Sequence, residues 1–229
     1  QLPFDFQVTG ATQSNQYLML KNSQQAYLLD ASMTLTLISD ADYPGWNVNA
    51  VTSITRSGTT ATVTTASATN IPNGSTVTMA GADQADYNGD KVITVTGPTT
   101  FTFTVANSPA TPATGTITAT GGITTVPGIV FLDGYFFVMD ENAKIYGCEL
   151  NTPATWNALN FISAIKEPGA GKAIAKSQNY VIAFKEWSTE FFFDAGNATG
   201  SPLSPVDNGF TLVGCAAGES VANVDGILF

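Results

Sequence analysis

The chain has 229 residues and a net charge of −10, from 18 acidic and 8 basic side chains, and it contains no histidine. An acidic surface repels phosphate, which argues against tight or sequence-specific nucleic-acid binding. The lack of histidine excludes Ser-His-Asp and Cys-His catalytic sites and His-ligated zinc. Only 11% of residues are charged, and long amphipathic helical patterns are absent. The composition therefore predicts an all-β protein with many short strands.

Short strands are expected along the first 46 residues. Phe4, Phe6 and Val8 alternate with polar residues and predict the first strand. Apolar runs follow at residues 16–20, 26–30 and 33–38, separated by polar turns. Pro44 then ends strand pairing, because proline has no backbone N–H.

The composition changes abruptly between residues 47 and 122. These 76 residues include 21 threonines and only five charged side chains. Apolar residues alternate with threonine in about six runs, with turn signals such as Asn88-Gly89 between them. Strands with one apolar and one hydroxyl-covered face predict a small β-sandwich of the immunoglobulin-like (Ig-like) type.

This block is interpreted as an insertion, because the sequence after it resembles the sequence before it in texture. The host domain would comprise residues 1–46 and 123–229, which is 153 residues, with the inserted domain at residues 47–122. Short strands joined by tight turns suit propeller blades of about 40–50 residues, so the host is expected to be a partial β-propeller of about three blades. The chain starts at Gln1 and ends in an apolar run, from which we expect it to be one portion of a longer protein.

The host is expected to resume in residues 128–161. Asp133-Gly134 is a strong two-residue hairpin signal between residues 129–132 and 135–139. Another strand is predicted at residues 144–148, before a break and the aromatic anchor Trp156. Pairing of this stretch with residues 17–38, across the 76 residues of the insert, would make the host one domain.

Further along the chain, a strand pair is predicted at residues 180–184 and 189–193. Residues 194–208 are rich in Gly, Pro and Ser and predict a loop. Residues 210–213 form a short apolar piece, and Asp225-Gly226 predicts a last hairpin.

Two stretches partly match ligand-binding motifs. Asp86, Asn88 and Asp90 fit the first three ligand positions of a calcium loop, but glycine falls at the fourth place of the loop instead of the sixth, and Gly97 occupies the twelfth place instead of Glu. A hairpin turn rich in Asp and Asn is the preferred interpretation of residues 83–90. Residues 169–172 (GAGK) hint at a phosphate loop, but they lack its first glycine and its Ser/Thr, so a surface turn is preferred.

Glu186 and Glu190 flank Trp187 and would face the same side of a strand. Paired carboxylates beside an aromatic side chain could form a glycosidase site or a sugar platform, although a solvated strand face is the preferred interpretation. Cys148 and Cys215 are interpreted as buried reduced thiols, with a single disulfide left open. No catalytic, cofactor-binding or metal-binding residue is assigned.

Four host segments, in order, resemble the packaged-DNA stabilisation protein of short-tailed phages, which is the tail hub or nozzle component. They are residues 39–44 (SDADYP), 131–136 (FLDGYF), 155–161 (TWNALNF) and 214–217 (GCAA), the last followed by residues 220–222 and Asp225-Gly226. Within the insert, residues 78–90 and 97–105 look like a β-domain that is found grafted into phage virion proteins.

The resemblance implies a structural, non-enzymatic virion protein with a propeller-like subunit that is assembled in the host cytoplasm. Its copies, expected to be six, would form a ring that continues the portal–adaptor channel, helps retain packaged DNA and allows its ejection. The implied partners are portal-adaptor proteins, a tail needle, and tailspike or fibre proteins. Genomic DNA would pass without sequence-specific binding. No cofactor is expected, and no membrane partner, because no apolar run has transmembrane length.

Two other functions stay open at this stage. The chain could be a receptor- or carbohydrate-binding virion protein that uses the threonine-rich insert as its binding module. It could also be a glycan hydrolase that uses Glu186 and Glu190, in which case both should line a cleft.

Overall fold

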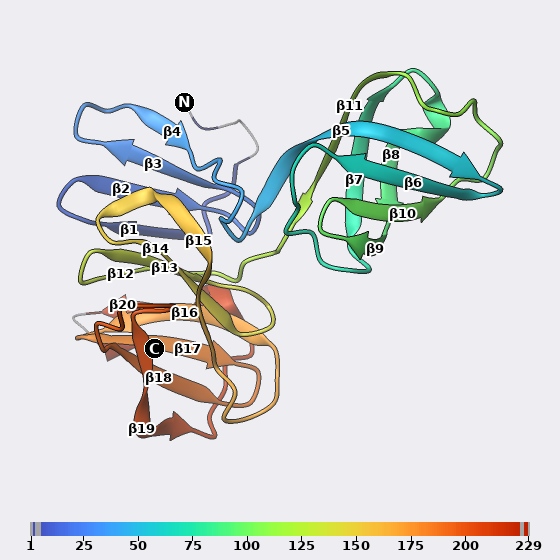
Figure 1. Cartoon of the computed structure of the whole chain (residues 1–229). Coiled ribbons are helices and arrows are strands. Elements are labelled where there is room, and N and C mark those ends of the chain that lie inside the picture. Colours follow the sequence, from blue (N-terminus) through green and yellow to red (C-terminus); the bar gives the residue numbers. More distant parts are fainter. Residues whose placement is uncertain (1, 3–5, 225–226, 229) are drawn as a thin grey trace. The chain divides into compact units, whose positions relative to one another are not determined.

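The computed structural model describes residues 2, 6–224 and 227–228 and confirms an all-β protein (Figure 1). Two short 3-10 turns, η1 (Ala85–Tyr87) and η2 (Gly218–Ser220), are the helical elements of this described part. The chain forms two compact units: unit 1 contains Gln1–Pro44 and Thr124–Phe229, and unit 2 is Gly45–Ile123.

Unit 1 contains three four-stranded antiparallel sheets, each a simple meander in chain order. We call them blades 1, 2 and 3. Blade 1 has β1 (Gly10–Gln13), β2 (Tyr17–Lys21), β3 (Ala26–Asp30) and β4 (Leu35–Leu37). Blade 2 has β12 (Val130–Leu132), β13 (Tyr135–Met139), β14 (Lys144–Glu149) and β15 (Thr152–Ser163). Blade 3 has β16 (Gly171–Ser177), β17 (Tyr180–Lys185), β18 (Thr189–Asp194) and β19 (Leu203–Thr211). A short pair, β20 (Asn223–Val224) and β21 (Ile227–Leu228), follows.

The expected blade spacing is confirmed, but several strand boundaries were predicted wrongly. The first strand begins at Gly10, after Val8, whereas Phe4 lies outside the described residues. The last six residues of the predicted loop at residues 194–208 belong to β19, which pairs with β18 through a bulge at Glu190/Phe192 despite its Pro and Gly. The predicted hairpin turn at Asp225-Gly226 also lies outside the described residues.

A repeat that was not predicted from the sequence runs through the three blades. The second strand of each blade starts with tyrosine, and a buried charged residue ends this strand or directly follows it. The third strand ends in an acid nine residues after the charged residue. The three sets are Tyr17, Lys21 and Asp30; Tyr135, Asp140 and Glu149; and Tyr180, Lys185 and Asp194. Blades 2 and 3 repeat this pattern at a period of 45 residues, and this period could have revealed the repeat in the sequence.

The segment after the insert joins the blades of unit 1. The N–H of Gly128 donates to the carbonyl of Thr9 in blade 1 (3.0 Å), and the carbonyl of Pro127 accepts from the N–H of Ile174 in blade 3 (3.0 Å). Lys21, which is fully buried, donates from Nζ to the carbonyl of Val126 (2.7 Å). A few backbone groups near Pro127 therefore connect parts of the chain that lie far apart in sequence.

The expected pairing of residues 128–161 with residues 17–38 does not form, because the strands of blades 1 and 2 belong to separate sheets. The two parts of the host instead meet through residues just after that range. The side chain of Asp40 accepts a hydrogen bond from the backbone N–H of Trp156 (3.2 Å), and the rings of Tyr43 and Trp156 meet edge to face at 5.0 Å. Both Tyr43 and Trp156 are buried. Aromatic pairs of this kind add about 0.5–1.5 kcal/mol beyond the burial of their surface. Trp156 is thus a structural anchor for residues that precede the insert.

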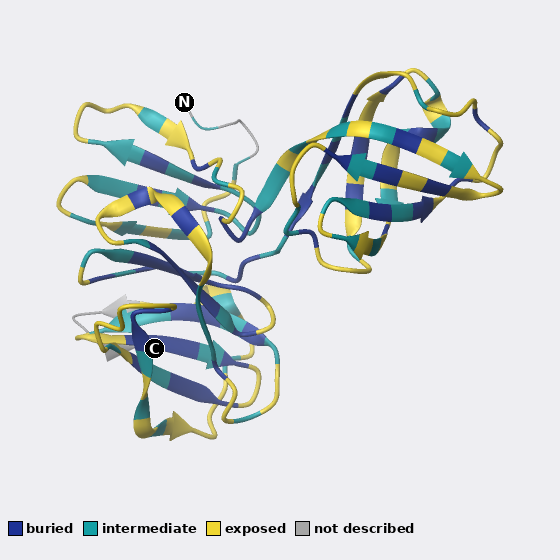
Figure 2. Ribbon diagram, in the orientation of Figure 1, coloured by how far each residue is buried: buried dark blue, intermediate teal, exposed yellow. Residues whose placement is uncertain are grey.

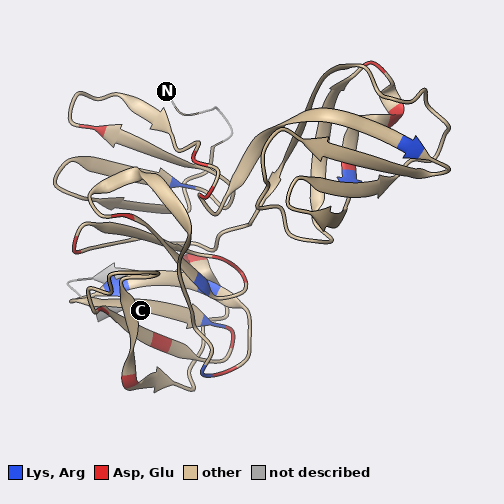
Figure 3. Cartoon of the chain, in the orientation of Figure 1, with Lys and Arg blue, Asp and Glu red and all other residues tan. Residues whose placement is uncertain are grey.

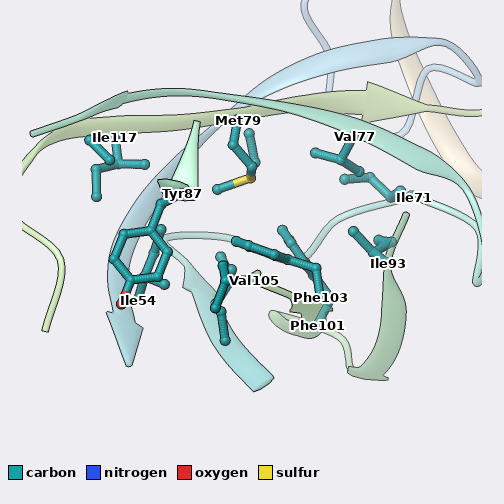
Figure 4. Packing of buried hydrophobic residues seen from close by; sticks show 14 residues of the cluster. Ile54, Ile71, Val77, Met79, Tyr87, Ile93, Phe101, Phe103, Val105 and Ile117 are labelled. Carbon is teal, nitrogen blue, oxygen red and sulfur yellow. The ribbon is translucent and has the colours of Figure 1, made fainter. Parts of the chain in front are cut away.

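Unit 2 is a seven-stranded sheet in the order β8-β7-β11-β5-β6-β10-β9. Its strands are β5 (Trp46–Ser57), β6 (Thr60–Thr65), β7 (Thr76–Ala82), β8 (Gly89–Val92), β9 (Thr94–Gly97), β10 (Thr100–Thr104) and β11 (Gly115–Gly122). Buried and exposed residues alternate along these strands (Figure 2), and the buried side chains converge on one core around Met79, Tyr87 and Phe103 (Figure 4). The two end strands, β8 and β9, are consecutive in the chain and meet at the buried Ile93, which closes the curled sheet.

The first and last strands of unit 2 are neighbours. β5 and β11 pair antiparallel, and their register places Trp46 opposite Gly122. The two ends of this unit therefore leave from one place, as an inserted domain requires. The Ig-like class and the domain boundaries at residues 46/47 and 122/123 stay predictions.

We expect Gly128→Ala to destabilise unit 1 strongly. Gly128 has φ +92°, and an added Cβ would lie 1.9 Å from the carbonyl oxygen of Ile174. Gly196→Ala is the matched control, because Gly196 also has a positive φ (+64°) but nothing within 4 Å. The control should cost about 1 kcal/mol of unfolding free energy, and Gly128→Ala at least about 2 kcal/mol more. The unfolding free energy of unit 1 is measured by denaturant unfolding followed by tryptophan fluorescence. A Trp46→Phe background removes the tryptophan of unit 2 from the signal. Equal losses would show that the close approach does not matter.

Lys21 should make the stability of unit 1 rise with pH. Burial lowers the pKa of Lys21 from 10.5 to about 7. Between these values the unfolded chain binds the proton and the folded chain does not, so the unfolding free energy increases as pH rises. From pH 7 to 8.5 the gain should be about 1–2 kcal/mol in the wild type, and Lys21→Met should remove it. If the unfolding free energies of wild type and variant changed equally with pH over this range, the low pKa assigned to Lys21 would be contradicted.

Candidate functional site

The calcium-loop-like stretch at residues 83–90 is a hydrogen-bonded hairpin around η1. Asp83 accepts from the hydroxyl of Thr114 (2.8 Å), and Asp90 accepts from the hydroxyl of Thr78 (2.7 Å). The side chain of Asn88 pairs with both backbone groups of Ala82. These side chains brace the turn, as the hairpin interpretation predicts. Within the described residues, no group of three or more His, Cys, Asp or Glu is placed to hold a metal ion.

The phosphate-loop-like stretch at residues 169–172 leads into a strand. Gly171 begins β16, and its N–H donates to the carbonyl of Glu141 (2.8 Å). A phosphate loop instead leads into a helix, whose N-terminal N–H groups hold the anion. The geometry therefore supports an ordinary turn.

Glu186 and Glu190 do not lie on the same strand face, so that expectation is wrong. The turn between β17 and β18 separates them and leaves Glu186 exposed. Glu190 is 2% exposed, and its Oε1 lies 3.3 Å from Nζ of Lys185. The same oxygen accepts from the N–H of Lys166 (3.1 Å). A carboxylate sequestered in this way cannot act with Glu186 across a substrate, which removes the basis for the glycosidase hypothesis.

The buried Lys185–Glu190 pair is instead part of the scaffold. Lys185 also donates to the carbonyls of Ala164 (2.8 Å) and Glu167, which lie in the linker between blades 2 and 3. Buried charges are tolerated when partners of this kind replace water. The pair fixes the linker against the turn between β17 and β18.

The two cysteines are free thiols, and only one of them is buried. Cys148 accepts a hydrogen bond from the N–H of Phe136 (3.1 Å), and burial raises its pKa to about 11. Cys215 is half-buried, so the expectation of two buried thiols is wrong for this residue. A raised pKa keeps the Cys148 thiol protonated and unreactive.

One face of unit 2 consists of aligned hydroxyl groups. Three rows of directly opposed residues cross β5, β6 and β10, and one of them continues onto β9. The rows are Thr55, Thr62, Thr102 and Thr94; Ser53, Thr64 and Thr100; and Ser57, Thr60 and Thr104. None of these positions carries a charge, and charged side chains are sparse over the whole of unit 2 (Figure 3).

Two adjoining cavities lie where the inner strands of unit 1 meet. One, of 690 Å³, is lined by polar residues that include Gln24, Glu141 and Lys172. The other, of 510 Å³, is lined mainly by small residues of β1 and β16 and by Pro127 and Gly128. Neither Glu186 nor Glu190 borders them.

We expect the Lys185–Glu190 pair to behave as a structural unit in mutants. Glu190→Leu leaves a buried lysine without its counter-ion and should cost about 3–5 kcal/mol of unfolding free energy. The double variant Lys185→Met/Glu190→Leu should cost less than Glu190→Leu alone, because no unpaired charge remains. Glu186→Leu is the control and should change the unfolding free energy by under about 0.5 kcal/mol. A double variant that loses the sum of both single effects would refute the coupling.

Comparison with known proteins assigns the chain to a family. The family model described as "Bacteriophage P22 Gp10, beta-propeller", a phage-stabilisation family, matches residues 5–229. The comparison with curated proteins found no match. Within the described residues, no helix is long and apolar enough to cross a membrane.

Two solved structures resemble the chain weakly. An endosialidase of phage phi92 is 14% identical over 81% of this chain, with a TM-score of 0.28, and this chain spans only 35% of its length. The computationally designed Ika8 protein is 11% identical over 97% of this chain and 92% of its own, also with a TM-score of 0.28. Scores this low carry no argument about fold or function. The match to the family model covers nearly the whole chain, and the three blades of unit 1 agree with its description, so the chain belongs to the phage-stabilisation (P22 Gp10) β-propeller family of phage structural proteins.

Proposed function

We propose that the chain is a subunit of the tail hub, or nozzle, of a short-tailed phage. Copies of it, expected to be six, form a ring that continues the portal–adaptor channel, retains packaged DNA and allows its ejection. The observation that carries this proposal is the family match over residues 5–229 together with the bladed unit 1. We place the chain in the virion after assembly in the host cytoplasm.

The charge of unit 1 suits a channel through which DNA slides. The third strands of the three blades end in Asp30, Glu149 and Asp194, and Asp133 lies in the β12–β13 turn at the same end of the blades. Burial raises the pKa of Tyr135, and the neighbouring Asp194 and Glu149 carboxylates raise it further, as expected for negative potential. We propose that this acidic end faces the channel and repels the duplex.

The proposed partners follow from this position in the particle. They are neighbouring copies in the ring, portal-adaptor proteins, a tail needle, and tailspike or fibre proteins, with genomic DNA passing without sequence-specific contacts. Membership in a family of phage structural proteins argues against an enzyme.

A second candidate function is receptor or carbohydrate binding by unit 2. The uncharged hydroxyl face favours it, because hydroxyl groups can bind sugars without charge repulsion. On this candidate the chain would occupy a peripheral fibre rather than a ring on the particle axis.

A particle reconstruction decides between these positions. We expect density for the chain in a ring below the adaptor, and particles that lack the chain should package DNA but lose it. A peripheral, trimeric fibre would refute the hub proposal and support the second candidate.

The channel orientation has its own test. Asp133→Lys/Asp194→Lys particles should eject DNA at least about tenfold more slowly at low salt, with recovery at high salt, because the added cations bind phosphate. The control Asp42→Lys/Glu141→Lys makes the same charge change at the other end of the blades and should eject normally. Equal slowing in both variants, or in neither, would contradict the proposed orientation.

A further inference from the structure

Unit 1 carries an exposed apolar surface at one end of blade 3, which we call the Trp187 patch. Its five members come from three loops: Ile165 from the linker before β16, Trp187 from the turn between β17 and β18, and Phe210, Leu212 and Val213 from the end of β19 and beyond. Ile165, Trp187, Leu212 and Val213 are between 66% and 81% exposed, and Phe210 is 37% exposed. Clusters of large exposed apolar side chains mark interaction sites more often than single ones do.

Close contacts place these three loops against one another. An added Cβ at Gly214 would lie 2.6 Å from the backbone nitrogen of Trp187, and one at Gly169 would lie 3.1 Å from the Trp187 ring. The hydroxyl of Thr189 donates to the carbonyl of Val213 (2.7 Å). The amine of Lys166 lies 5.3 Å from the centre of the Phe210 ring. The patch is therefore continuous across the loops.

The loops are held rigidly. The N–H of Glu186 donates to the carbonyl of Ala170 (2.9 Å), and the N–H of Cys215 donates to the carbonyl of Lys185 (2.8 Å). Beneath them, the buried Lys185–Glu190 pair fixes the linker from below. A surface that is ordered before binding loses little conformational entropy when a partner binds.

The fold itself does not require these side chains. The corresponding turns of the other blades, residues 22–25 (NSQQ) and 140–143 (DENA), contain no aromatic or large aliphatic residue. An indole that is two-thirds exposed buries little surface and contributes little to stability. Tryptophan is also the residue most enriched among those that dominate binding energy at protein interfaces.

The charges around the patch indicate what binds there. The carboxylates of Glu167 and Glu186 border it and form no hydrogen bond or ion pair with any described residue. The nearby cation, Lys166, already donates to the carbonyl of Val206 (3.3 Å). We propose that the Trp187 patch binds a segment of another protein that carries aliphatic side chains flanked by Lys or Arg. This inference does not depend on the hub proposal.

Other occupants fit less well. A second copy of the chain is acidic overall, with 18 acids against 8 bases, and two of its lysines, Lys21 and Lys185, are buried. An anionic membrane would be repelled by the unpaired carboxylates. A glycan would stack on Trp187, but it would leave Leu212 and Val213 without apolar contacts.

The test uses the full 229-residue chain and three synthetic 12-residue peptides, which alternate Leu with Lys, Leu with Glu, or Ser with Lys. We expect the Leu/Lys peptide to bind at least about tenfold more tightly than the other two, because it supplies both apolar and cationic groups. Trp187→Ser and Leu212→Ser should each weaken this binding at least about tenfold. Glu186→Lys should weaken Leu/Lys binding and strengthen Leu/Glu binding. Calorimetry measures the affinities.

Leu159→Ser is the matched control, because Leu159 is 72% exposed on blade 2, away from the three loops. It should leave the affinity unchanged within about twofold, and unchanged melting curves would show that all variants fold. Equal binding of the Ser/Lys peptide would overturn the proposal in favour of simple charge attraction. Trp187-dependent binding to neutral phosphatidylcholine vesicles or to dextran, or a Trp187-dependent doubling of the solution mass, would overturn it in favour of a membrane, a glycan or a second copy.

Discussion

The organisation of unit 1 depends on the close approach of the segment Val126–Gly128 to the backbone of blade 3. At Gly128 an added methyl group would overlap the carbonyl of Ile174. This close approach lets one short segment donate to Thr9 on one side and accept from Ile174 on the other. It also supplies the carbonyl that receives the buried amine of Lys21. Without these contacts the three blades would be joined mainly by side-chain packing.

The paired end strands of unit 2 explain how an inserted unit is tolerated. Unit 2 begins and ends on the paired strands β5 and β11, so the host chain can leave and return at one place. Its core is separate from that of unit 1, and the two edge strands of its curled sheet, β8 and β9, are short, at four residues each. An extra domain of this kind adds a surface to the host without altering the host's own packing. Its hydroxyl face is accordingly available for a role that differs from the role of the blades.

The sequence predicted the class of fold, the blade spacing and the central hairpin at Asp133-Gly134, because alternation and two-residue turns are local signals. It failed where long-range packing decides the structure. β19 forms despite its Pro and Gly residues, because it can pair along the outer edge of β18. Glu190 was expected on an open face, but three groups of the neighbouring linker hold Lys185 and Glu190 inside. The Trp187 patch was also not predictable, since it joins three loops that are distant in sequence.

The buried charges of unit 1 show how structural and functional demands are separated in this chain. Lys21 and Lys185 occupy equivalent positions at the ends of second strands, and both donate to carbonyls of a segment that links two blades. Lys21 donates to the segment before blade 2, and Lys185 donates to the linker before its own blade 3. Their hydrogen bonds fix the linkers between blades, and because both side chains are buried they cannot contact a partner. The acids that end the third strands remain partly exposed at the opposite end. In the channel that we propose, this arrangement would keep the buried cations away from phosphate and present carboxylates instead. The repeat that builds the blades contains four acids and two lysines, so it contributes part of the acidic balance of the composition.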